Sequence, residues 1–206
     1  MAVVPTIIPG SPISVFSAMT RKVFEKADVI ALVAEVFREL GYEGASMSAI
    51  TERTKLSKGS LYHFFPGGKE EMAAEILAHV DAWFVGAVFE PLEQGEPRAA
   101  IDRMWGAVDD YFRSGRRVCL IGAFALDETR DRFAPAIRLY FKRWIQALTA
   151  ALSRAGAEAT TAKQVAEETV IGIQGALTLA RALNDKAIFA RSLAQLRRRV
   201  DAVTPC

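Results

Sequence analysis

Apolar residues recur at spacings of three and four along most of the chain, which is the period of amphipathic α-helices. The first such stretch begins at Thr20 and ends at Gly41. Long stretches follow over residues 69–89, 99–112, 129–155, 162–183 and 186–203, with proline, glycine or asparagine at most of the breaks. The pattern therefore predicts an all-α fold.

Shorter elements lie between the first two long stretches, in the segment SMSAITERTKLSKGSLYHFFPGGK (residues 46–69). Ser46 and Ser57 are good N-cap residues, because a serine side chain accepts a backbone N–H bond in the first helical turn. We expect helices over about 47–54 and 58–64, joined by a tight turn. Gly59 in the later helix costs about 1 kcal/mol relative to alanine, which indicates that another surface approaches closely there.

Charge in this segment has one sign. No Asp or Glu occurs between Arg53 and Lys69, whereas Lys55 and Lys58 add further positive charge. Positive side chains and helix N-termini both attract phosphates. A solvated basic surface would have the same composition, but the helix-turn-helix spacing, with hydroxyl and aromatic donors on the short helix, favours nucleic-acid binding.

Whole-chain composition narrows the class of protein. The chain has 206 residues, 51% of them hydrophobic and 24% charged, with a net charge of +2, which is typical of a globular protein. The two cysteines, Cys119 and Cys206, suit a reducing compartment; a redox role for Cys119 is a less favoured alternative. No uncharged apolar stretch reaches the roughly 18 to 20 residues of a membrane span, so we expect a cytoplasmic protein without a membrane partner.

Other chemistries find little support. PGGKE lacks the upstream glycine and the following Ser or Thr of a phosphate-binding loop. The two histidines, His63 and His79, have no nearby cysteine or carboxylate cluster at ligand spacing. The sequence contains no nucleophilic residue with a basic residue at a spacing suited to catalysis. We therefore expect no enzyme activity, no metal and no cofactor.

The segment SKGSLYHFFPGGKEEMAAEIL resembles the recognition helix and the start of the next helix in TetR-type transcriptional regulators, and its PGGKEEM part is similar to the LmrA/YxaF-like subgroup. The resemblance extends over residues 20–77, and CLIGAFALDETRD resembles the same subgroup less specifically. It implies a homodimeric repressor that binds a palindromic DNA operator and is released by a hydrophobic small molecule. The residues that it places at the operator are Ser46, Lys55, Ser57, Lys58, Gly59, Ser60, Tyr62, His63 and Lys69.

Within that set, the resemblance implies that Tyr62 and Lys69 contact phosphates of the DNA backbone and that Lys58 reaches a base edge. Two positions depart from the family pattern. Lys55 stands where the turn commonly has glycine, so it either adopts a left-handed or bridge conformation or adds a phosphate contact. Phe64 stands where relatives often have a second histidine, which would remove one phosphate donor.

The resemblance also implies a domain organisation: a three-helix DNA-binding domain over 20–68 and a helical ligand-binding and dimerisation domain over 69–206. Residues 1–19 carry no charge and contain several prolines. They form either a disordered arm or a segment upstream of the true translation start, which would then be Met19 and not Met1.

Aromatic residues concentrate between Trp83 and Trp144, and a helical domain lined in this way can hold a flat hydrophobic ligand. Plain core packing is the alternative for any single aromatic side chain. The resemblance favours a pocket, and the residues expected to line it are Trp83, Phe84, Met104, Trp105, Val108, Tyr111, Phe112, Cys119, Phe124, Phe141 and Trp144.

The last two predicted helices contain a strip of small residues that allows close approach of another helix. Two such helices from each subunit would form a four-helix dimer interface, while burial within one chain is the alternative. The expected interface residues are Gly172, Gly175, Ala176, Leu179, Ala180, Leu183, Phe189, Leu193 and Leu196. Two further hypotheses remain open: a helical small-molecule-binding or catalytic protein, and a nonspecific nucleic-acid-binding protein without an operator.

Overall fold

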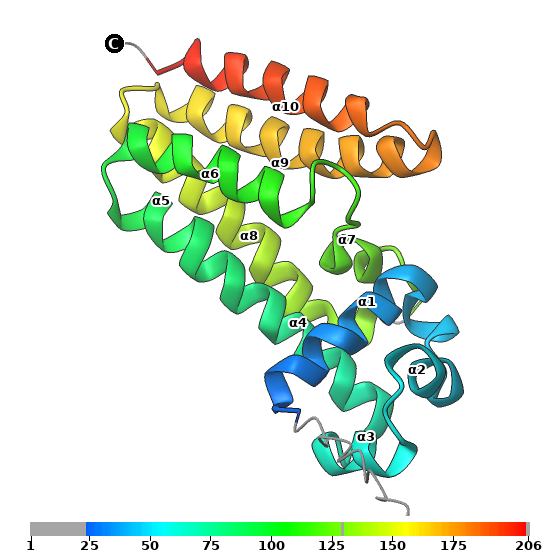
Figure 1. Ribbon diagram of the computed structural model, residues 1–206. Coiled ribbons are helices and arrows are strands. Elements are labelled where there is room, and N and C mark those ends of the chain that lie inside the picture. The colour runs from blue at the N-terminus through cyan, green and yellow to red at the C-terminus, as the bar shows by residue number, and fades with distance from the viewer. Residues whose placement is uncertain (1–23, 129, 205–206) are drawn as a thin grey trace, which may run out of the picture.

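The computed structural model describes residues 24–128 and 130–204, and within these ranges the secondary structure is entirely helical, as predicted (Figure 1). The expected arm and both candidate start methionines lie outside the described residues. In chain order the elements are α1 (Lys26–Gly44), α2 (Met47–Thr54), α3 (Lys58–Phe64), α4 (Gly68–Phe84), the π-helix η1 (Val85–Phe89), α5 (Glu90–Gln94), α6 (Pro97–Tyr111), α7 (Leu120–Ala125), α8 (Arg130–Arg154), α9 (Ala159–Ala182) and α10 (Lys186–Asp201).

The first three helices form a small amino-terminal unit. The helical path of α1 breaks at Gly41, where φ is 69° and ψ is 178°, a conformation that favours glycine. The chain therefore turns where the hydrophobic pattern predicted the end of the first helix. Beyond this break, Tyr42 is buried among the side chains of Phe37, Phe124 and Phe133.

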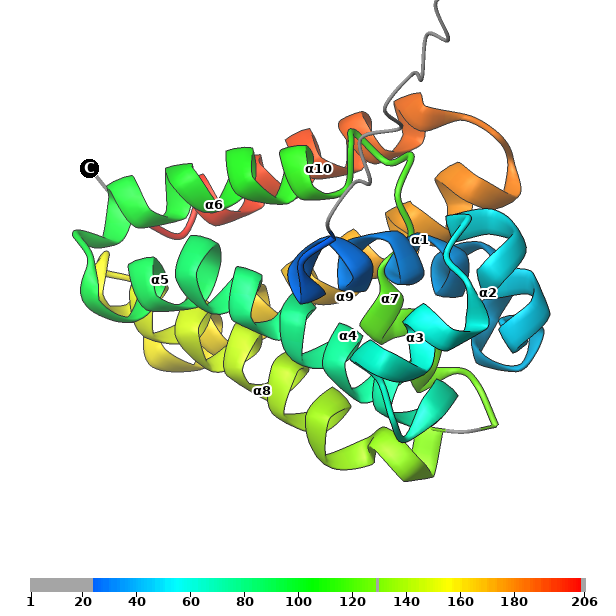
Figure 2. The same ribbon diagram turned by 60° about the horizontal axis from the view of Figure 1, so that its bottom comes forward.

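A single rod made of α4, η1 and α5 connects this unit to the rest of the molecule (Figure 2). The π-helical turn inserts into the rod without ending it, since Val85 and Glu90 keep right-handed helical dihedrals on both sides. By length and composition alone, residues Gly68–Gln94 would be apolar enough to cross a membrane. Buried residues along the rod, such as Met72, Ile76 and Phe84, account for part of this apolarity.

The remaining helices form layers, with α10 lying along α9, α9 along α8, and α6 beside the α5 end of the rod (Figure 1). Helices α9 and α10 approach closely at Gly172. A Cβ atom added there would lie 2.8 Å from Leu196 Cδ2, so a larger residue would push α10 away.

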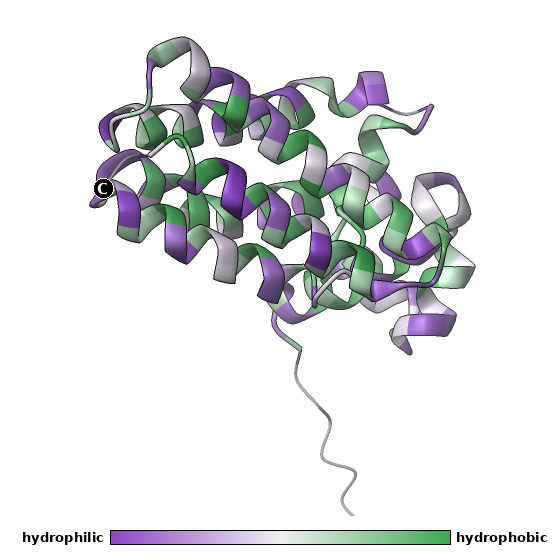
Figure 3. Ribbon diagram, turned by 90° about the horizontal axis from the view of Figure 1, so that it is seen from above, coloured by the Kyte–Doolittle hydropathy of each residue, from purple (hydrophilic) through white to green (hydrophobic). Residues whose placement is uncertain are grey.

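One continuous hydrophobic core runs through both parts of the chain. Its centre is an aromatic cluster in which the ring of Phe84 lies 5.1 Å from that of Tyr140 and 5.2 Å from that of Trp144. The hydrophobic stretches of the helices lie mainly where the helices face one another, and the hydrophilic stretches lie mainly on the outside (Figure 3). The amino-terminal helices therefore share their packing with the larger unit.

Candidate functional site

Helix α3 presents an exposed polar and aromatic face. Leu61 is fully buried and anchors the helix to the core, whereas Lys58, Tyr62 and His63 are exposed. Tyr62 keeps 42% of its surface accessible although it is a large aromatic residue, and the Lys58 Nζ lies 6.0 Å from its ring centroid. The face thus combines a cation, a phenol hydroxyl and an imidazole on one short helix.

The serines of the predicted set build the ends of these helices. Ser46 Oγ accepts a hydrogen bond from the Ala49 backbone N–H at 3.2 Å, and Ser57 Oγ accepts one from the Ser60 N–H at 3.0 Å. A Cβ atom added to Gly59 would meet only Ser57 Oγ, at 3.8 Å. Nothing within the described protein therefore requires glycine at this position.

Lys55 adopts the left-handed conformation, with φ of 61° and ψ of 16°, and closes α2 through its N–H bond to Thr51 O at 3.0 Å. This conformation agrees with the first of the two alternatives for Lys55, in which a non-glycine residue adopts the left-handed conformation at some energetic cost. Its side chain remains exposed and has no ion pair among the described residues. A phosphate contact by the same residue stays a prediction.

Replacement of Lys55 by glycine should raise the free energy of unfolding by about 0.5 to 1 kcal/mol, because glycine adopts this backbone conformation without strain. Urea denaturation measures the change. Lys55→Ala is the matched control, since it removes the charge but keeps the Cβ atom, and it should not stabilise the protein. Equal stabilisation by both variants would contradict backbone strain as the cause.

Lys69 of the predicted set, and Arg53 of the same segment, are engaged within the protein. Lys69 Nζ lies 4.2 Å from the ring centroid of Tyr42 and 3.8 Å from a carboxylate oxygen of Glu43. Arg53 forms an ion pair with Glu39. The cations of this segment that have no ion pair within the described residues are therefore Lys55 and Lys58.

Phe64 is half-buried and packs against the core, with its ring 5.4 Å from that of His63 and 6.5 Å from that of Phe65. The aromatic side chain thus supports the helix from behind. Its neighbour His63 remains exposed as the one imidazole of this helix.

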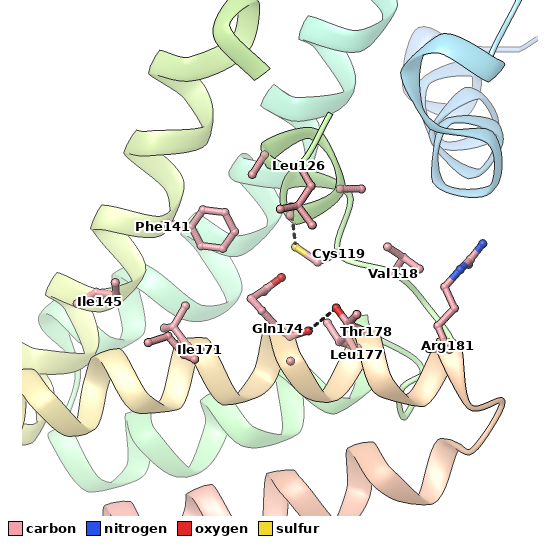
Figure 4. A pocket seen from close by; sticks show the side chains of 16 residues that line it. Val118, Cys119, Leu126, Phe141, Ile145, Ile171, Gln174, Leu177, Thr178 and Arg181 are labelled. Carbon is pink, nitrogen blue, oxygen red and sulfur yellow. Dashed lines mark hydrogen bonds between the residues drawn. The ribbon is translucent and has the colours of Figure 1, made fainter. Parts of the chain in front are cut away.

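A cavity of about 990 Å³ lies between α7, α8 and α9, together with the residues that precede α7 (Figure 4). Its wall is formed mainly by aliphatic and small side chains. The lining residues are Val118, Cys119, Gly122, Ala123, Ala125, Leu126, Phe141, Ile145, Val170, Ile171, Gln174, Gly175, Leu177, Thr178, Arg181 and Ala182.

This wall differs from the predicted one, of which it contains only Cys119 and Phe141. Trp83 is 36% exposed and lies on the surface. The other predicted residues fill the core because their bulky side chains pack against one another, and they leave the space beside the smaller residues of α7 and α9. The members that belong to the packed core are Phe84, Met104, Trp105, Val108, Tyr111, Phe112, Phe124 and Trp144.

Few polar groups face the cavity. Gln174 belongs to its wall, and its backbone carbonyl accepts a hydrogen bond from the Thr178 hydroxyl at 3.0 Å. Burial raises the pKa of the Cys119 thiol, against the opposing effect of the Gly122 backbone N–H and the Gln174 side chain. The thiol is therefore protonated and poorly reactive at neutral pH.

A polar contact joins α1 to the segment that leads into the cavity. Arg117 Nη2 donates to Glu35 Oε1 at 2.7 Å, and Arg38 Nη1 donates to the same oxygen at 2.7 Å. Arg38 Nη2 also donates to the Tyr111 hydroxyl at 3.1 Å. Burial would raise the pKa of Glu35, but Arg38 and Arg117 outweigh it and hold that pKa below its ordinary value. We call these four residues the Glu35 cluster.

Part of the predicted dimer surface is buried within the chain. Ala176, Ala180 and Phe189 are buried, Gly172 faces Leu196 of α10, and Leu193 and Leu196 are half-buried against the core. These residues pack α10 onto α9, as the alternative of burial within one chain anticipated. Gly175, Leu179 and Leu183 remain exposed.

A helix-turn-helix unit with an exposed recognition face, joined to a helical domain with an apolar cavity, defines a helical DNA-binding transcriptional regulator. Residues 29–76 match the family model for bacterial regulatory proteins of the tetR family, and residues 97–195 match the model for the C-terminal domain of LmrA/YxaF-like transcriptional regulators. The chain belongs to the TetR family of transcriptional regulators, and it is not an enzyme.

Individual relatives agree with this assignment. The HTH-type transcriptional regulator LmrA of Bacillus subtilis is 24% identical over 160 residues, which cover 73% of this chain and 83% of that protein. An uncharacterized HTH-type transcriptional regulator of Mycobacterium tuberculosis is 25% identical over 169 residues, covering 76% and 84%. A TetR transcriptional regulator from Legionella pneumophila has the same fold, with a TM-score of 0.72 at 18% identity, covering 86% of this chain and 98% of that one.

Proposed function

We propose that the protein is a cytoplasmic, ligand-responsive repressor that binds a palindromic operator as a homodimer and releases it when a hydrophobic small molecule enters the cavity. The observation that carries this proposal is the exposed face of α3. Lys58, Tyr62 and His63 lie there without burial in the protein, on a helix fixed from behind by Leu61.

Each exposed residue has a chemical task in this proposal. Lys58 reaches a base edge in the major groove, and Tyr62 and Lys55 contact phosphates. The open space at Gly59 allows the DNA backbone to approach α3 closely. Lys69 contributes less than the resemblance implied, because its ammonium group already contacts Tyr42 and Glu43.

The exposed side of α9 supports the homodimer. Leu179 and Leu183 are 52% and 64% exposed, and neither lines the cavity. Large exposed leucines on a surface helix are typical of a protein interface. A second copy of the chain related by two-fold symmetry would cover these leucines and would pair two reading helices for a palindromic site.

Leu179→Glu should convert the dimer to a monomer at micromolar concentration, because a charged carboxylate at the centre of an apolar interface loses its hydration. Size-exclusion chromatography with light scattering measures the mass. Glu167→Leu changes a half-buried position of the same helix without adding charge, and this control should remain dimeric. A dimeric Leu179→Glu variant would place the interface elsewhere.

The Glu35 cluster offers a route from the cavity to α1. Val118 and Cys119 line the cavity and directly follow Arg117, which pairs with Glu35. A ligand that displaces Val118 would move Arg117 relative to α1 and tilt the reading helices. A coupling of about 1 to 3 kcal/mol changes operator affinity roughly 5- to 150-fold, which is sufficient for a switch.

Sequence selection on random duplex DNA, with and without a library of hydrophobic molecules, tests the proposed function. We expect a shared palindrome with half-sites about 34 to 36 Å apart or at multiples of that distance. Recovery of no shared sequence, together with a steep salt dependence, would instead support nonspecific nucleic-acid binding. Loss of the selected DNA in the presence of one ligand class would identify the effector.

A further inference from the structure

The charges around the cavity define which hydrophobic molecules it accepts. Among residues 24–128 and 130–204, Arg181 is the one charged residue in the cavity wall, and no Asp or Glu of these ranges lines it. The Arg181 guanidinium forms no hydrogen bond or ion pair with any residue in the described part of the chain. A cation at the edge of an apolar cavity attracts an anionic group and repels a cationic one.

The position of Arg181 places this charge at one end of the cavity. The side chains of Phe141, Ile145 and Ile171 lie toward the other end, Gln174 lies between, and Arg181 extends from α9 near Val118 (Figure 4). An elongated ligand that fills the apolar space therefore ends beside a guanidinium. Such a group binds a carboxylate through parallel N–H bonds.

Asp185, which is near Arg181 in sequence, and Glu35 of the Glu35 cluster both have other partners. Asp185 accepts a bond from the Ala187 backbone N–H at 2.9 Å and another from Arg191 at 3.4 Å. Glu35 is held by Arg38 and Arg117. The segment before α7 adds the exposed cations Arg113 and Arg116, which increases the positive charge of the chain leading to Val118.

We propose that the effector is an elongated apolar molecule with one acidic group, and that Arg181 selects it by pairing with that group. This inference rests on the proposed function, because it assigns a ligand class to the same cavity. Gln174 adds a carboxamide to a wall that is formed mainly by apolar side chains. Neutral molecules of the same length bind more weakly, and lipophilic cations bind weakest of all.

The experiment uses three probes with twelve-carbon chains: laurate and dodecyltrimethylammonium below their micelle concentrations, and dodecanol below its solubility limit. Isothermal titration calorimetry on the full chain measures affinity. We expect laurate to bind roughly two- to fivefold more tightly than dodecanol, with the preference declining at high salt because a charge pair is screened. The ammonium probe should bind more weakly than dodecanol.

Two variants and one control separate the steps of this inference. Arg181→Gln should weaken laurate binding roughly two- to fivefold and leave dodecanol binding unchanged. Arg198→Gln removes an exposed arginine of α10 outside the cavity wall and should change neither. Ile145→Trp fills the apolar part of the cavity and should weaken all three probes.

The outcomes distinguish failure of the ligand class from failure of the cavity itself. Equal binding of laurate and dodecanol, or an unchanged preference for laurate in Arg181→Gln, would overturn the anionic ligand class. If Ile145→Trp still weakened binding in that case, the cavity would remain the effector site. If no probe bound, or if Ile145→Trp left every affinity unchanged, the cavity would not be the effector site and both proposals would fail.

Discussion

Lys58→Ala is expected to weaken operator binding by roughly 1 to 3 kcal/mol in each half-site and to relax the preference at one base position. The lysine is exposed, forms no ion pair within the described residues and begins α3, where the helix N-terminus already favours phosphates. Fluorescence anisotropy with the selected palindrome measures the affinity, and repetition of the selection with the variant measures the relaxed position.

Tyr62→Phe provides the contrasting variant, because it removes one hydroxyl and retains the ring. It should weaken binding to all sequences similarly, since a phosphate contact carries no sequence information. Lys163→Ala, at an exposed position near the start of α9, controls for the loss of one positive charge and should bind as the parent does. If both α3 variants also bound as the parent does, α3 would not be the reading helix.

Glu35→Gln is expected to abolish most of the ligand response and to lower the free energy of unfolding by about 1 to 3 kcal/mol. The substitution preserves the shape of the side chain but leaves Arg38, whose side chain is only 5% exposed, without its carboxylate. Urea denaturation measures the stability. The ratio of operator affinities with and without ligand measures the coupling.

Arg117→Met separates coupling from stability. It removes the contact from the cavity segment to α1 and keeps the pair of Arg38 with Glu35, so it should lose the ligand response with a smaller loss of stability. Glu168→Gln, which disrupts an exposed contact with Arg199, is the matched control and should keep both properties. A normal ligand response in Arg117→Met would exclude this route.

The effect of Glu35→Gln should also depend on pH. Because the folded protein holds the pKa of Glu35 below its ordinary value, the carboxylate stabilises the fold above that ordinary value and loses this contribution as the pH falls through the lowered pKa. The stability difference between parent and variant should therefore shrink on acidification. A difference that stays constant with pH would assign the effect to packing and not to charge.

Local features of the helices were predictable from the sequence. The expected spans 47–54 and 58–64 coincide with α2 and α3, because Ser46 and Ser57 specify helix starts through their own side-chain bonds. The break at Gly41 was likewise visible, since glycine readily adopts a positive φ. The conformation of Lys55 was not decidable, because the cost of a left-handed lysine is small enough for the surrounding fold to impose it.

Placement across the fold was harder to predict. Periodicity identifies an apolar face but not its partner, so Phe189 and Leu179 received the same prediction although the former is buried and the latter exposed. The cavity lies beside residues other than most of the predicted lining, for a related reason. Aromatic side chains fill space by themselves, and the informative signal was the combination of small residues in α7 with Gly175 and Ala182 in α9.

The shared core and the Glu35 cluster also bear on the construction of chimeric biosensors, in which the operator specificity of one regulator is combined with the ligand domain of another. A junction placed at the loop before α4 would exchange α1 and thereby separate Glu35 and Arg38 from Arg117 and Tyr111. Grafting only the exposed residues of α3 onto this scaffold leaves those contacts intact. The natural unit of exchange in this protein is thus a helix surface, smaller than a domain.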